Sequence, residues 1–95
     1  FAQRGRIGRL LVGIAENPQS LGIGIDEDTA IIVSDNNEFT VMGSGAVYVI
    51  DGSNITYSNV SEQYPEEILS IFDVKLHVLK YGNKFDLINK KPCNS

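Results

Sequence analysis

The hydrophobic pattern of this 95-residue chain changes its period once, near residue 18. Before that point, four apolar residues follow the i, i+3, i+4, i+7 spacing of an amphipathic helix: Ile7, Leu10, Leu11 and Ile14. Asn17 and Pro18 form a stop signal, because proline disfavours helical geometry in the residue before it. The pattern therefore predicts one helix from about Gly5 to Glu16.

After Pro18 the apolar residues fall in short runs that are rich in β-branched and aromatic side chains, as is typical of strands. The predicted strands are 21–25, 29–34, 38–42, 46–50, 55–58, 72–79 and 84–88. Turn-forming residues follow the second, third and fourth runs and predict that these adjacent runs form antiparallel hairpins or a meander. Pro65 is placed to open one short helical turn.

The first predicted strand, 21–25, has an unusual glycine face. Gly22 and Gly24 point to one side, and the large apolar residues of the strand point to the other. A bare face lets another element pack very closely against the strand. Open α/β sheets place their sites at the carboxyl ends of such strands.

Three consecutive acids, Asp26, Glu27 and Asp28, stand at that carboxyl end. Neighbouring carboxylates raise one another's pKa unless cations or hydrogen-bond donors stabilise them. One interpretation is a solvated acidic turn, and the other gives one of the three a structural or catalytic partner. In extended chain, alternation would separate Glu27 from its two neighbours.

The charge is segregated along the chain. Residues 1–12 carry three arginines and no acid, whereas residues 13–95 carry five lysines and twelve acids, which gives +3 and −7. The acidic body argues against general affinity for nucleic acid, which needs an extended basic surface. Arg4 in a non-helical lead-in, with Arg6 and Arg9 on the first helical turn, could converge on a carboxylate or phosphate. The alternative is that these arginines simply face solvent.

Other features predict no cofactor and no metal site. The chain contains no tract of 18 apolar residues, so its sequence predicts no membrane-spanning helix. The single cysteine, Cys93, excludes an internal disulfide and a multi-cysteine metal site. In the run 72–79, alternation assigns His77 to the surface of a strand. It assigns the opposite, buried face to four apolar residues: Phe72, Val74, Leu76 and Val78.

Four strings of the sequence together resemble the C-terminal part of the cyanophycinase family: QRGRIGRLLVGIAENP, LGIGIDEDTAIIV, VMGSGAVYVIDGS and LSIFDVKLHVLKYGNKFDL. Members of this family are serine peptidases with a class I glutamine-amidotransferase-like, flavodoxin-like α/β fold. The resemblance implies that residues 1–95 are the C-terminal segment of one peptidase domain, with a single helix followed by a β-rich part. It places the nucleophilic serine and the catalytic histidine in an N-terminal half, the histidine directly before Phe1.

The resemblance also implies roles for particular residues. Glu27 falls at the position of the triad acid, and Arg4, Arg6 and Arg9 fall at the substrate-binding arginines. The implied substrate is cyanophycin, multi-L-arginyl-poly-L-aspartate, which is hydrolysed to β-aspartyl-arginine dipeptides. The 95 residues alone would be inactive. The implied protein is a homodimer without cofactor, metal, nucleic acid or membrane, and it is cytoplasmic, with a secreted relative as the alternative.

Two alternatives to cyanophycin hydrolysis remain at this point. A peptidase of the same family could act on other β-aspartyl or acidic peptides. A non-catalytic β-rich module could instead use the arginine-bearing helix start to bind anions.

Overall fold

The computed structural model describes residues 6–59 and 70–93. Within these residues one helix, α1 (Arg6–Glu16), precedes nine strands. The strands are β1 (Leu21–Ile25), β2 (Thr29–Val33), β3 (Glu38–Gly43), β4 (Val47–Asp51), β5 (Tyr57–Ser58), β6 (Ile71–Phe72), β7 (Lys75–Leu79), β8 (Lys84–Asp86) and β9 (Lys91–Cys93).

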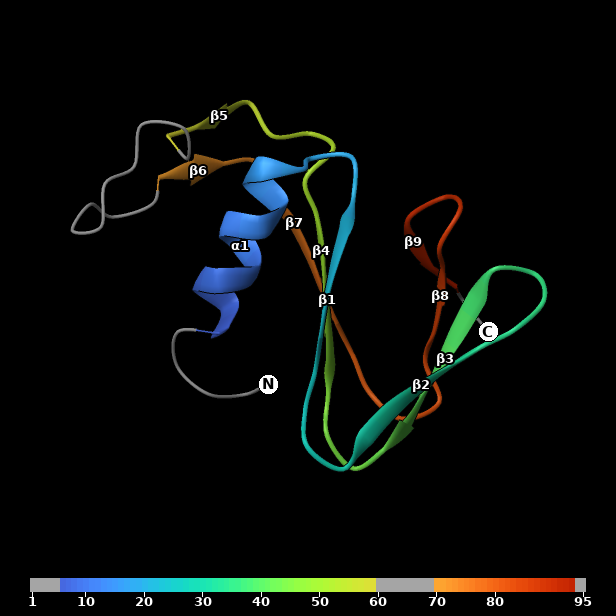
Figure 1. The fold of residues 1–95 in the computed structure, drawn as a ribbon. Coiled ribbons are helices and arrows are strands. Elements are labelled where there is room, and N and C mark those ends of the chain that lie inside the picture. The colour runs from blue at the N-terminus through green and yellow to red at the C-terminus, as the bar shows by residue number, and fades with distance from the viewer. Residues whose placement is uncertain (1–5, 60–69, 94–95) are drawn as a thin grey trace.

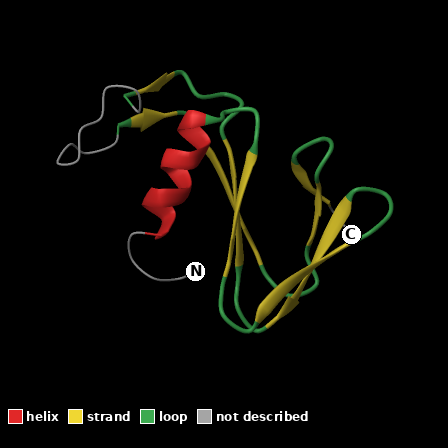
Figure 2. Ribbon diagram, viewed as in Figure 1, coloured by secondary structure: helices red, strands yellow, loops and turns green. Residues whose placement is uncertain are grey.

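Most strands belong to one antiparallel meander that is bent in the middle. One sheet has the order β1-β4-β7 and the other has the order β2-β3-β8-β9, and β5 and β6 form a separate two-stranded sheet. Figure 1 shows the two larger sheets as the two sides of a V. The chain crosses from one sheet to the other between β1 and β2 and again between β3 and β4. Loops make these crossings at the vertex (Figure 2).

The strand register does not slip across this bend. Ile25 pairs with Val47 in the first sheet, and Thr29 pairs with Gly43 in the second. Three residues therefore intervene on each arm, and β1–β2 and β3–β4 are the two arms of one long, kinked hairpin. Corners of this kind let strands leave one sheet and join another that packs across it.

The helix α1 packs on the outer face of the first sheet, over β1 and β4. A Cβ built on Gly22 would lie 2.8 Å from Leu10 Cδ1 and 3.0 Å from Ile14 Cγ1, so the helix lies almost directly on the strand backbone. Gly24 is buried as well. The predicted helix, its end before Pro18 and the glycine face of β1 are confirmed.

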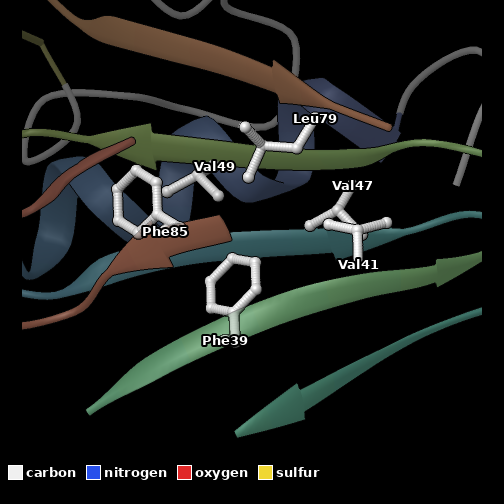
Figure 3. Packing of buried hydrophobic residues seen from close by; sticks show 6 residues of the cluster. All are labelled: Phe39, Val41, Val47, Val49, Leu79 and Phe85. Carbon is white, nitrogen blue, oxygen red and sulfur yellow. The ribbon is translucent and has the colours of Figure 1, made fainter. Parts of the chain in front are cut away.

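The main core lies between the two sheets. Six buried side chains from β3, β4, β7 and β8 converge there (Figure 3): Phe39, Val41, Val47, Val49, Leu79 and Phe85. The rings of Phe39 and Phe85 stack with centroids 5.6 Å apart. Because β3 and β4 alternate inward and outward residues, the bend brings the inward residues of both strands into the same core.

The predicted strands are largely confirmed, but two of the predicted pairings are wrong. β2 and β3 form the expected hairpin, but β3 and β4 do not pair with each other, because the Ser44–Ala46 segment between them is part of the bend, and β4 does not pair with β5, which belongs to a separate sheet. The β9 strand was not predicted; it contains Pro92 and lies at a sheet edge, where a missing N–H is tolerated. The helical turn predicted at Pro65 lies outside the described residues.

The predicted faces of the run 72–79 are wrong. Asp73 adopts a left-handed conformation with φ of 65°, which interrupts the run and separates β6 from β7. Leu76 and Val78 are 49% and 60% exposed, whereas the His77 ring packs on Phe85 with centroids 5.4 Å apart.

The cause of this inversion is the limited reach of α1. Leu76 and Val78 pair with Ile50 and Tyr48, which share the helix-facing side of the sheet, but the main contacts of α1 are with β1 and β4. Phe72, also predicted to be buried, is 55% exposed on β6. Within β7, alternation therefore separated the two faces correctly, but the core lies on the opposite face from the one predicted.

Replacement of Gly22 by valine should destabilise the fold by about 1 to 3 kcal/mol, because the new side chain would displace α1. Gly13→Ala is the control, since a Cβ there meets nothing within 4 Å and should add about 0.5 to 1 kcal/mol of helix stability. Urea denaturation measures both changes. Equal effects of the two substitutions would contradict close packing at Gly22.

Candidate functional site: the acidic corner

The three consecutive acids lie at the bend of the long hairpin. We define the corner as residues 26–28, which connect β1 to β2, and residues 44–46, which connect β3 to β4. The corner therefore lies at the carboxyl end of β1, as the sequence predicted for these acids.

Asp26 holds the two arms of the corner together. Its backbone N–H donates to the carbonyl of Ala46 at 3.1 Å, and the N–H of Ala46 donates to Asp26 Oδ2 at 2.9 Å. In regular antiparallel strands, two such opposed residues would each donate an N–H to the other's backbone carbonyl. Here the Asp26 carboxylate replaces its own backbone carbonyl as the acceptor for Ala46. Asp26 is partly buried and has a structural role.

Thr29 makes a second connection between the arms. The N–H of Gly45 donates to Thr29 Oγ1 at 2.9 Å, and the same hydroxyl donates to the backbone carbonyl of Glu27 at 3.0 Å. One hydroxyl therefore links residues 26–28 to residues 44–46 and hydrogen-bonds the peptide group between Glu27 and Asp28.

The backbone of the corner uses two left-handed residues. Asp28 has a φ of 57° and Gly43 has a φ of 106°. Aspartate tolerates this conformation better than most residues, and glycine adopts it without steric cost. The Asp28 carbonyl accepts a hydrogen bond of 3.2 Å from the N–H of Ser44. These contacts determine the path of the chain through the corner.

The corner places the three carboxylates in different environments. Asp26 is partly buried and accepts a backbone hydrogen bond, whereas Glu27 and Asp28 are exposed. The side chains of Glu27 and Asp28 make no hydrogen bond or ion pair with the residues that the structure describes. Both interpretations of the acids are thus partly right, since one acid is structural and two face solvent, available to a cationic partner.

The predicted arginines are only partly placed. Arg6 begins α1 and Arg9 lies one turn further on, with an exposed side chain, while Arg4 lies outside the described residues. The first turn of α1 contains no acid. Because α1 and β1 run in opposite directions, this turn lies toward the end of the sheet at which β1 reaches the corner (Figure 1).

Other candidate groups are set apart from the corner. His77 faces the core, its buried Nε2 has no hydrogen-bond partner among the described residues, and its environment is apolar. Cys93 lies on β9, where burial and the Glu38 carboxylate raise the pKa of its thiol. Across 6–59 and 70–93, no cluster of three metal-binding side chains occurs, and no helix is long and apolar enough to cross a membrane.

Asp51, at the other end of β4, is the one charged residue among the buried described residues, with 4% of its surface exposed. Burial raises the pKa of its carboxyl, but hydrogen bonds from Ser53 and the charges of Lys90 and Lys75 outweigh burial and hold this pKa below its usual value. The Ser53 N–H donates to Asp51 Oδ1 at 2.9 Å. Asp51 therefore stabilises the fold in its ionised form.

The fold and the corner define a general class: an α/β segment that presents exposed carboxylates at the end of a glycine-faced strand. No family model matches the chain. Individual relatives do, and they are cyanophycinases. The chain is 37% identical over 90 residues to the cyanophycinase of Trichormus variabilis. The aligned region covers 95% of this chain and 30% of that protein.

Two further cyanophycinases agree with this result. The identity is 34% over 92 residues with the protein of Geminocystis herdmanii and 36% over 87 residues with that of Synechococcus elongatus. The resemblance recognised in the sequence is thus confirmed along nearly the whole chain. The chain spans only 27 to 34% of the length of these curated relatives.

Asp51→Asn should lower the free energy of unfolding at pH 7 by about 1 to 2 kcal/mol, because it removes a charge-assisted hydrogen bond. Because the Asp51 carboxyl has a lower pKa in the folded state than in the unfolded state, it stabilises the fold at pH values above the unfolded-state pKa of about 3.9. This stabilisation is lost as the pH falls through the folded-state pKa. The difference between variant and wild type should therefore shrink between pH 5 and pH 2.

Urea denaturation at several pH values tests this expectation. Asp35→Asn, in the exposed β2–β3 turn, is the control and should show little difference at any pH. A difference for Asp51→Asn that stays constant from pH 7 to pH 2 would contradict the assignment.

Proposed function

We propose that this chain is the C-terminal part of a cyanophycinase-like serine peptidase, and that it supplies the triad acid and substrate-binding arginines. The observation that carries the proposal is the resemblance to cyanophycinases over 92 to 97% of the chain. The remaining two thirds of such an enzyme would supply the nucleophile and the base. A glutamine-amidotransferase-like domain is the fold proposed for the whole protein.

Glu27 is the proposed triad acid. Its carboxylate is exposed at the end of β1 and accepts no hydrogen bond from the described residues, so it is available to a histidine from the other part of the enzyme. A carboxylate in this position orients the imidazole of the base and stabilises the imidazolium that forms when serine attacks. Asp26 is a poorer candidate because it already accepts the Ala46 N–H.

The arginines are the proposed receptor for the carboxylates of the polyaspartate backbone. A helix start without acids favours anions through its free N–H groups and its dipole. Guanidinium groups bind carboxylates through paired hydrogen bonds and so orient the scissile bond. Arg9 is exposed, as this role requires, and Arg4 and Arg6 are included because of the resemblance.

An uncovered apolar surface supports the proposal that the chain packs against the rest of the enzyme. Leu76 and Val78 continue the helix-facing side of the first sheet beyond the reach of α1, and both are exposed. β7 is an edge strand in the described part of this sheet. Exposed apolar side chains on an open edge favour association, so we propose that the N-terminal part of the enzyme covers them.

In the complete enzyme, Glu27→Gln should lower kcat by roughly a hundredfold to ten-thousandfold with little change in stability, because the imidazolium loses its stabilising charge. Asp26→Asn and Asp28→Asn should each cost much less. The measurement is steady-state hydrolysis of a β-aspartyl-arginine polymer, with circular dichroism to confirm folding. A fully active Glu27→Gln beside an inactive Asp28→Asn would transfer the role to Asp28.

In the complete enzyme, Val78→Cys should be protected from a maleimide reagent, because the N-terminal part covers this face. The background carries serine in place of each native cysteine, including Cys93. Asp35→Cys, in an exposed turn, is the matched control and should react rapidly. Equal rates at the two positions would refute the proposed contact, and protection that vanishes on dilution would assign the face to a second copy of the protein.

A further inference from the structure

We propose that the Thr29 hydroxyl is a positioning group for the Glu27 carboxylate. This inference rests on the proposed function, because it assumes that Glu27 acts on a catalytic histidine. Thr29 itself touches no reacting atom in this account. Its effect passes through the backbone of the corner.

The hydrogen bonds of Thr29 suit this role. Its hydroxyl donates to the Glu27 carbonyl at 3.0 Å and accepts from the Gly45 N–H at 2.9 Å. Because one hydroxyl can donate and accept at the same time, it connects Glu27 to Gly45 on the opposite arm of the hairpin. A side chain lacking the hydroxyl would break both connections at once.

The corner has few other restraints near Glu27. The Asp26–Ala46 hydrogen bonds hold the chain before it, and the Ser44–Asp28 hydrogen bond holds the chain after it. Of these described contacts, the Thr29 hydroxyl is the one that acts directly on the peptide group of Glu27. Loss of the hydroxyl would therefore loosen Glu27 while both neighbouring restraints remain.

Gly45 shows how closely the two arms approach. A Cβ built on Gly45 would lie 2.6 Å from Thr29 Oγ1 and 2.6 Å from Asp26 Cβ. Any other residue at this position would push the arms apart. The close approach of the two arms therefore requires a glycine at position 45.

A displaced carboxylate affects turnover more than it affects folding. A misplacement of about 1 Å can cost up to roughly a hundredfold in rate, because the base is no longer held in its reactive orientation. Thr29 is only partly buried, so the two backbone groups that lose the hydroxyl lie close to solvent. The expected signature is a loss of kcat without a matching loss of stability.

The test compares Thr29→Val, which keeps the shape but removes the hydroxyl, with Thr29→Ser, which keeps the hydroxyl. In the complete enzyme, Thr29→Val should lower kcat about tenfold with KM nearly unchanged, and Thr29→Ser should restore most of the activity. Ser34→Ala is the matched control, because Ser34 Oγ also donates to a backbone carbonyl in a turn, that of Glu38, at the opposite end of β2 from Thr29. It should leave kcat unchanged.

Activity is measured at a temperature at which circular dichroism shows every variant to be folded. Gly45→Ala provides a second perturbation of the same contact and should also lower kcat. If Thr29→Val and Gly45→Ala keep full activity while Glu27→Gln is impaired, the positioning role is wrong and the proposed function stands. If Glu27→Gln itself is fully active, both the positioning role and the triad assignment fail.

Discussion

The bend in the long β1–β4 hairpin is the constraint on which the rest of this structure depends. It brings the inward residues of β3 and β4 into one core, and the crossing from β7 to β8 follows the same path into the second sheet. The register is preserved across the bend, so the backbone has to turn without an extra residue on either arm. Through that turn the Asp26 carboxylate and the Thr29 hydroxyl accept hydrogen bonds from the backbone of the opposite arm and so hold the two arms together.

The same bend accounts for the crowding of three acids. Asp26 is partly buried as an acceptor for Ala46, Asp28 takes a left-handed conformation, and Glu27 is held between them with an exposed side chain. Repulsion is reduced because the carboxylates lie in different environments and two of them are solvated. In the proposed enzyme, a histidine would supply the missing positive charge during turnover.

The local elements could be predicted because each has a clear hydrophobic period. The helix, β1 and its glycine face follow directly from residues 7–25, where spacing and breakers agree. The corner could not be predicted, since it depends on Thr29 and Asp26 meeting Gly45 and Ala46 from a distant part of the chain. A serine–glycine turn after β3 looks the same in a hairpin and in a bend.

The faces of β7 show a second limit of pattern reasoning. Alternation separates Leu76 and Val78 from His77, but it does not say which set is covered, because that depends on how far α1 extends across the sheet. The apolar pair is exposed here, and a histidine occupies the core side. The role proposed for Glu27 likewise rests on the resemblance to cyanophycinases, since contacts alone leave Glu27 and Asp28 equally available.

We propose that a catalytic serine and histidine, encoded upstream of Phe1, complete this chain. The most direct measurement is the nucleotide sequence of the gene immediately before the codon for Phe1. We expect an in-frame histidine codon next to Phe1 and, farther upstream, a serine in a glycine-flanked strand-to-helix turn. A stop codon or an unrelated domain at that place would contradict it.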